Sequence, residues 1–122
     1  MSETATYRVT VVTGTARGAG TDADVYITLI GDADSTPELV LDGASNDFER
    51  SATNTFQLHA IDVGTLQRIR IRHTNTGIGA GWLLDHVRIR NEGTGVEATF
   101  PCGRWLATDE DDGQTTRELT AA

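Results

Sequence analysis

The sequence lacks lysine, contains one cysteine, and has no apolar run long enough to cross a membrane. A single cysteine, Cys102, cannot form a disulfide within the chain. Spanning a bilayer takes about 20 apolar residues, so we expect no transmembrane segment and only peripheral membrane contact. The opening residues, MSETATYRVT, contain neither a positively charged segment nor an apolar run, so no signal peptide is visible. We therefore expect a cytoplasmic protein or an excised module of a larger one.

Motifs of the common enzyme classes are also missing. The three histidines are dispersed without the paired spacing of a zinc site, and no G-x-S-x-G nucleophile motif occurs. Cys102 has no base at a motif spacing, which favours a small buried hydrophobic residue over a nucleophile. We therefore expect that this chain is not an enzyme.

The charge balance is acidic, with 18 Asp and Glu residues against 10 cations, all arginine, and a formal net charge of −8. This balance argues against non-specific nucleic-acid binding, and we expect no nucleic-acid partner. It also excludes a generally basic, membrane-attracted surface, although local basic patches remain possible. The length of 122 residues predicts a single domain, which we expect to be a monomer.

Glycines and short polar clusters interrupt the sequence at the spacing typical of an all-β sandwich or barrel. Period-2 patterns predict eight short strands and no helix of normal length. The expected strands are residues 6–13, 24–31, 38–42, 54–59, 66–73, 82–90, 95–100 and 114–119.

Arginines alternate with apolar residues in two of these strands. Ile69 and Ile71 face inward in LQRIRIRH, and Val87 and Ile89 face inward in WLLDHVRIR. If the two strands are antiparallel neighbours, one sheet face carries a positive stripe made of Arg68, Arg70, Arg72, Arg88 and Arg90. Such a stripe could dock an anionic lipid headgroup or an acidic protein partner. Alternatively, acidic residues on adjacent strands neutralise it.

The stretch GAGTDADVYITLIGD raises the question of a ligand loop. Its glycines formally fit a dinucleotide fingerprint, but a β-branched strand follows where that fingerprint needs a helix, which argues against nucleotide binding. What remains is a turn between strands with Thr21, Asp22 and Asp24 at its exit. Oxygen-rich loops suit hard cations, but Asp22 could equally make a turn hydrogen bond.

A second oxygen-rich cluster lies in SNDFERSATNTFQL, where Asn46, Asp47 and Glu49 stand close together and Phe48 could anchor the loop in the core. With the first loop it could complete a set of calcium ligands if the fold brings the two together. The acidic run 109–112 invites an EF-hand comparison, but Leu119 stands where that loop needs a bidentate glutamate. We interpret this run as a solvated acidic turn.

The order of five motifs resembles the PLAT domain, the β-sandwich named after polycystin, lipoxygenase and alpha-toxin. The motifs are YRVTVVTG, GAGTDADVYITLIG, NDFERSATNTF, GWLLDHVRI and FPCGRWL, and the match covers nearly the whole chain, about residues 6–119. The resemblance is strongest to the N-terminal domain of animal lipoxygenases. It implies an all-β sandwich of two four-stranded antiparallel sheets.

The resemblance also implies a calcium site at one end of the sandwich. Carried over by position, the ligands are the Gly20 carbonyl, a Thr21 carbonyl or hydroxyl, the Asp22 carboxylate, the Asn46 amide oxygen, and the carboxylates of Asp47 and Glu49. Gly81 stands where many relatives have an acidic residue, which places a further ligand from that loop in doubt.

Membrane contact is less strongly implied than calcium binding. Lipoxygenase-type domains that insert into bilayers carry exposed aromatic residues on their end loops, whereas the corresponding loops here offer Arg17 and Ile78. Trp105 could be half exposed and form an interfacial contact, and Trp82 is expected in the core. We therefore expect a calcium-binding module that associates with a lipid headgroup or a protein, or alternatively a metal-independent interaction domain that docks an acidic partner.

Overall fold

The computed structural model describes residues 4–15, 19–21, 24–41, 48–74, 81–108 and 113–121, and these ranges contain eight β-strands and no helix. The strands are β1 (Thr4–Thr13), β2 (Val25–Gly31), β3 (Leu39–Leu41), β4 (Thr53–Ile61), β5 (Leu66–His73), β6 (Trp82–Asn91), β7 (Glu97–Leu106) and β8 (Thr116–Thr120). Each overlaps a strand expected from the sequence.

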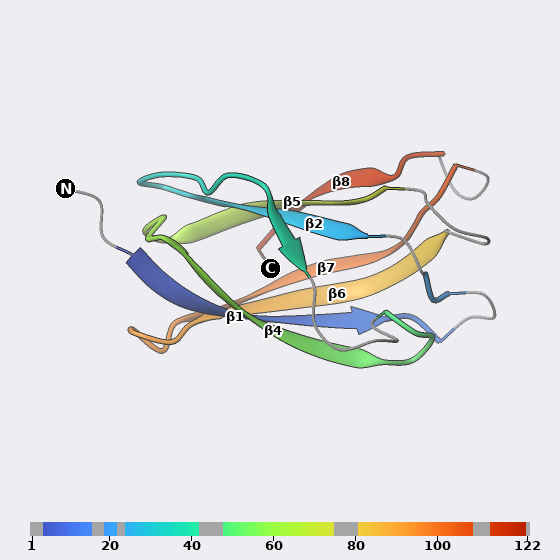
Figure 1. The fold of residues 1–122 in the computed structure, drawn as a ribbon, viewed down its shortest axis with the longest axis horizontal. Helices are drawn as coiled ribbons and strands as arrows, with labels where there is room; N and C mark the ends of the chain where they lie inside the picture. Colours follow the sequence, from blue (N-terminus) through green and yellow to red (C-terminus); the bar gives the residue numbers. More distant parts are fainter. Residues whose placement is uncertain are drawn as a thin grey trace.

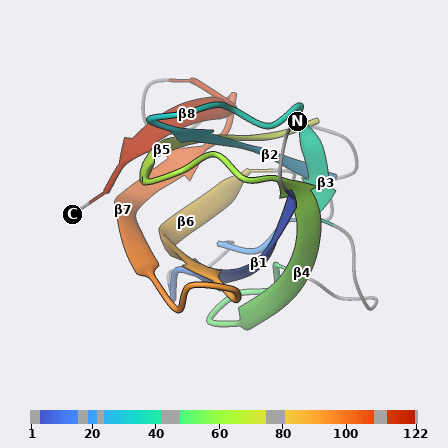
Figure 2. The same ribbon diagram turned by 90° about the vertical axis from the view of Figure 1, so that its left-hand side faces the viewer.

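The strands form two antiparallel sheets packed face to face, as Figures 1 and 2 show. One sheet has the order β4-β1-β6-β7 and the other β3-β2-β5-β8. This arrangement confirms the expected sandwich of two four-stranded sheets.

Period-2 alternation explains the core. Val9 and Val11 from β1, Ile27 from β2, Ile71 from β5 and Ile89 from β6 are all fully buried between the sheets. Their polar neighbours on each strand face outward, because successive side chains of a strand point to opposite faces.

Strand β7 runs six residues beyond the expected end at Phe100, since it continues through Pro101 to Leu106. Proline is tolerated there because β7 lies at the edge of its sheet. The pairing with β6 shifts register between Leu84 and His86, opposite a bulge in which Gly103 has a positive φ of 66°.

The expectation that the two arginine-bearing strands are neighbours is wrong. β5 and β6 belong to opposite sheets. Because Ile71 and Ile89 both face the shared core, the arginines of the two strands face outward on opposite sides of the molecule. The five residues therefore do not form one stripe.

The two ends of the sandwich have different connections. We call end A the end where β1, β3, β5 and β7 finish, and end B the end where β2, β4, β6 and β8 finish. The expected ligand loops follow β1 and precede β4, so both adjoin end A.

Candidate functional site

The two loops expected to bind calcium meet at end A. The Thr21 amide donates to the Phe48 carbonyl at 3.1 Å. A Cβ added to Gly20 would lie 2.9 Å from the Arg50 nitrogen and 3.0 Å from the Phe48 carbonyl oxygen. Only glycine therefore allows the first loop to approach the second this closely.

Phe48 anchors the second loop in the core, as expected. It is 4% exposed and has a positive φ of 64°. Its amide donates to Asn54 Oδ1 at 2.9 Å, and its ring packs edge-on against Trp82 and stacks on Phe56. A positive φ in an aromatic residue costs about 1–3 kcal/mol, which these contacts must offset. The neighbouring Glu49 is consequently held exposed at the surface.

The start of β6 ties the first loop to the core. Trp82 is fully buried, as expected, and its indole donates to Thr13 Oγ1 at 3.0 Å. The next residue, Leu83, donates its amide to the Ala19 carbonyl and accepts from the Gly14 amide. Both sides of the first loop are therefore fixed to one strand.

Of the six expected ligands, Gly20, Thr21 and Glu49 lie in the described part of the chain. Asp22, Asn46 and Asp47 lie outside the described residues. Within the described ranges, no group of three His, Cys, Asp or Glu residues could hold a metal. The donors that are described are carbonyl, hydroxyl and carboxylate oxygens, which is the chemistry that calcium prefers.

A third connection reaches the same end through a contact that the sequence did not signal. The Thr74 amide donates to the Asp24 carbonyl at 3.0 Å, and the Asp24 amide donates to Thr74 Oγ1 at 3.3 Å. Asn54, which holds Phe48, was also missed. Thr74 contacts a residue 50 positions away, and Asn54, although it lies within the motif NDFERSATNTF, accepts from a backbone amide that the motif does not single out.

Among the expected membrane contacts, Trp105 is described, whereas Arg17 and Ile78 lie outside the described residues. Trp105 is half-buried and lies opposite the half-buried Leu83 in the β6–β7 register. The Arg117 guanidinium donates twice to the Trp105 carbonyl. Cys102 is only partly buried, less so than expected for a core residue.

On the outer face of β5, acidic neighbours pair with the arginines. Arg72 makes a bidentate contact with Glu38, and this hydrogen bonding lowers the pKa of the Glu38 carboxyl. Arg68 and Arg70 both reach Glu118, at 3.5 and 3.1 Å. Each arginine in this part of the expected docking stripe therefore has an acidic partner, with two carboxylates for three arginines, in agreement with the alternative interpretation.

The β6 arginines differ from each other. Arg90 lies 3.9 Å from Glu92, which also pairs with Arg8 at 2.7 Å. Arg88 has no acidic partner among the residues that the structure describes. Its neighbours across the sheet are Thr10 and Thr99.

His73 links the two sheets at end A. Its ring is 2% exposed, and Nε2 is hydrogen-bonded to the Leu106 carbonyl, so this nitrogen carries the proton. Burial lowers the pKa of the imidazole from its ordinary value, while the bond to Leu106 opposes that shift. The folded protein therefore favours the neutral ring.

We expect the free energy of unfolding to decrease as the pH is lowered, because of His73. Above the ordinary histidine pKa of about 6.5 the ring is neutral in both states and adds no pH dependence. As the pH falls below that value, the unfolded chain binds the proton more readily, so the free energy of unfolding decreases. Urea denaturation at pH 7.5 and 5.0 should show a steeper loss for the wild type than for His73→Gln, which can still donate to Leu106. The control His59→Gln replaces an exposed histidine and should lose as much stability as the wild type. An equal loss in the wild type and in His73→Gln would exclude this role for His73.

Comparisons with known proteins identify the family and support the fold. Residues 7–120 match the family model of the PLAT/LH2 domain. Human lipoxygenase homology domain-containing protein 1 is 48% identical over 118 residues, which cover 93% of this chain and 6% of the human protein. Among the described residues, no helix is long and apolar enough to cross a membrane.

Two solved lipoxygenases have the same fold. A coral 8R-lipoxygenase, described as activated by calcium through a C2-like domain, has a TM-score of 0.86 at 30% identity, over 97% of this chain and 17% of the enzyme. A calcium-dependent 11R-lipoxygenase has a TM-score of 0.72 at 34% identity, over 96% of this chain and 17% of the enzyme. The chain therefore spans only a small part of each of these relatives.

Proposed function

This chain belongs to the PLAT/LH2 domain family, and we propose that it is a non-catalytic module that binds calcium at end A and then associates peripherally with a membrane. The observation that carries this proposal is the close approach of the two oxygen-bearing loops, which requires glycine at Gly20. Two lipoxygenases of the same fold are described as calcium-activated or calcium-dependent, which supports the same assignment.

Electrostatics give calcium a role in ordering this end. In the proposed site, Asp22, Asp47 and Glu49 bring three negative charges onto two touching loops, and their mutual repulsion opposes closure. A divalent cation would neutralise that repulsion and supply a positive centre. Gly20 and Thr21 would contribute neutral oxygens. Calcium typically takes six to eight oxygen ligands, so water would complete the set.

Membrane association would depend on the metal because of the net charge. A chain with a formal charge of −8 is repelled by an anionic bilayer unless the contacting end is made positive. The half-buried pair Trp105 and Leu83 adjoins end A and would add apolar contact. One buried apolar side chain contributes about 1.5–3 kcal/mol, too little for stable binding without the electrostatic part.

Co-sedimentation with phosphatidylcholine–phosphatidylserine vesicles tests this function. We expect binding in calcium and release by a chelator. The double variant Asp22→Ala, Asp47→Ala should lose the calcium-dependent fraction. The matched control Asp34→Ala, Glu97→Ala makes the same change in net charge at end B and should bind like the wild type. Binding that is salt-sensitive but indifferent to chelation would instead favour a metal-independent docking domain.

A further inference from the structure

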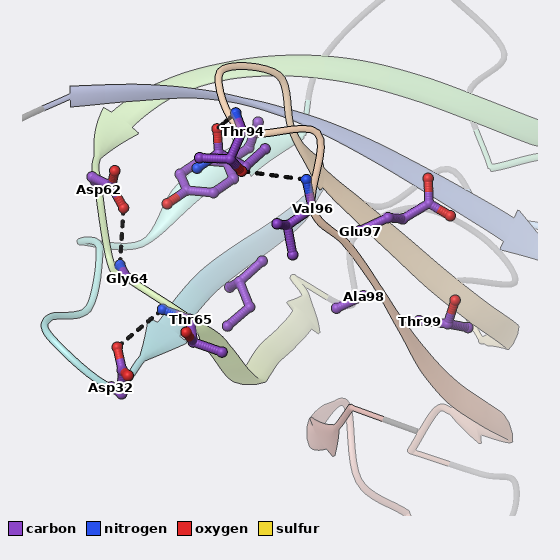
Figure 3. A pocket seen from close by; sticks show the side chains of 12 residues that line it. Asp32, Asp62, Gly64, Thr65, Thr94, Val96, Glu97, Ala98 and Thr99 are labelled. Carbon is purple, nitrogen blue, oxygen red and sulfur yellow. Dashed lines mark hydrogen bonds between the residues drawn. The ribbon is translucent and has the colours of Figure 1, made fainter.

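A cavity of about 780 Å³ opens at end B, opposite the proposed calcium site. It lies between the connection that follows β4 and the start of β7, as Figure 3 shows. Its volume is within the range of about 300–1,000 Å³ that is usual for ligand pockets. None of its described lining residues is a lysine, arginine or histidine.

Two carboxylates converge on one wall of this cavity. Asp62 Oδ1 accepts from the Gly64 amide at 2.9 Å, and Asp32 Oδ1 accepts from the Thr65 amide at 3.0 Å. Gly64 has a positive φ of 80°, and a Cβ added there would lie 2.3 Å from Asp32 Oδ1. The absence of a side chain at Gly64 therefore leaves room for both carboxylates to accept hydrogen bonds from the adjacent amides of Gly64 and Thr65.

Neither carboxylate has a cationic partner among the described residues. Asp62 instead contacts the fully buried Tyr7 hydroxyl, which also accepts from the Val63 amide. With Glu97, three carboxylates thus line the cavity, and none of its described lining residues is cationic.

The opposite wall is formed by residues 94–99 and mixes apolar with polar side chains, since Thr94, Glu97 and Thr99 line it as well as Val96 and Ala98. Val96 and Ala98 supply its apolar part, and Leu66 is a further apolar lining residue of the cavity. Val96 is 64% exposed and is one of two large hydrophobic residues exposed in the described chain. In Figure 3, Asp32 and Asp62 lie on the side facing Val96 and Ala98. The cavity therefore combines carboxylates with exposed apolar side chains.

We propose that this cavity receives a lysine or arginine side chain from a segment of a partner protein. The charged group would lie between Asp32 and Asp62, and its methylene stem would pack on Val96, Ala98 and Leu66. Long basic side chains combine such a stem and head in one group. A metal ion is a poorer match, because no group of three His, Cys, Asp or Glu residues in the described part of the chain could hold one.

The openness of the rim favours an attached side chain over a free small molecule. Gly64, Thr65, Val96 and Asp32 are all exposed. Small-molecule sites usually bury most of the ligand surface, which this rim cannot do. A partner segment would gain further contacts outside the cavity.

Nuclear magnetic resonance titration with an acetylated five-residue peptide, a lysine flanked by leucines, tests the proposal. We expect amide shifts concentrated at Gly64, Thr65 and Ala98. The variant Asp32→Asn, Asp62→Asn keeps an oxygen acceptor for each turn amide and should weaken binding by about tenfold, because it removes both charges. The control Asp24→Asn, Asp85→Asn makes the same change in net charge elsewhere and should bind like the wild type.

Three outcomes would overturn the proposal. The first is equal binding of a peptide with norleucine in place of lysine, which would leave an apolar groove without charge recognition. The second is equal binding by the Asp32→Asn, Asp62→Asn variant. The third is equally tight binding of free butylamine at the same amides, which would indicate a small-molecule site.

Discussion

Trp82→Ala is expected to lower the free energy of unfolding by about 3–5 kcal/mol. The side chain is fully buried, donates to Thr13 and packs edge-on against Phe48. Its removal would leave a cavity between the first strand and the second ligand loop, and Thr13 would lose its partner. Because domains are usually stable by about 5–15 kcal/mol, this change should unfold an appreciable fraction of the protein at moderate urea.

Trp105→Ala is the matched control, because it removes the same side chain from a half-buried position on edge strand β7. We expect a distinctly smaller loss there. Circular dichroism during urea denaturation measures both variants without relying on indole fluorescence. Equal losses at Trp82 and Trp105 would contradict the assignment of Trp82 as the residue that joins the core to end A.

Calcium is expected to stabilise the fold through the proposed site. At a free concentration of about 100 times the dissociation constant, mass action adds about 2.7 kcal/mol to the free energy of unfolding. For a domain of this size, that gain corresponds to a rise of roughly 10 °C in the midpoint of thermal unfolding. Calorimetric scans with calcium and with a chelator measure it.

The double variant Asp22→Ala, Asp47→Ala should unfold at one temperature in both conditions. Its chelator-treated form should be no less stable than the chelator-treated wild type, because the substitutions remove repulsion between the loops. A variant that still responds fully to calcium would show that the ion acts elsewhere on the chain.

The fold was predictable because alternation is a local signal. Ile69 and Ile71, like Val87 and Ile89, alternate with outward arginines, and both strands form as expected. Alternation gives the inward face of each strand but not its neighbour, so the sequence could not place β5 and β6 in opposite sheets. The length of β7 was missed because proline in a strand is informative only when its edge position is known.

The candidate site was predictable in part for the same reason. Gly20 and Thr21 stand in a local motif, and so does Glu49. Their contact depends on Phe48, whose backbone is held by Asn54 and whose ring meets Trp82 across a long sequence separation. The end B cavity had no sequence signal, because Asp32 and Asp62 lie on turns that only the fold brings together.

Calorimetric titration of calcium into chelator-stripped protein tests the central claim most directly. We predict micromolar to low-millimolar binding by the wild type and by the Asp34→Ala, Glu97→Ala control, and no binding by the Asp22→Ala, Asp47→Ala variant. If the wild type binds no calcium, or if the Asp22→Ala, Asp47→Ala variant binds as tightly as the wild type, end A is not a calcium site.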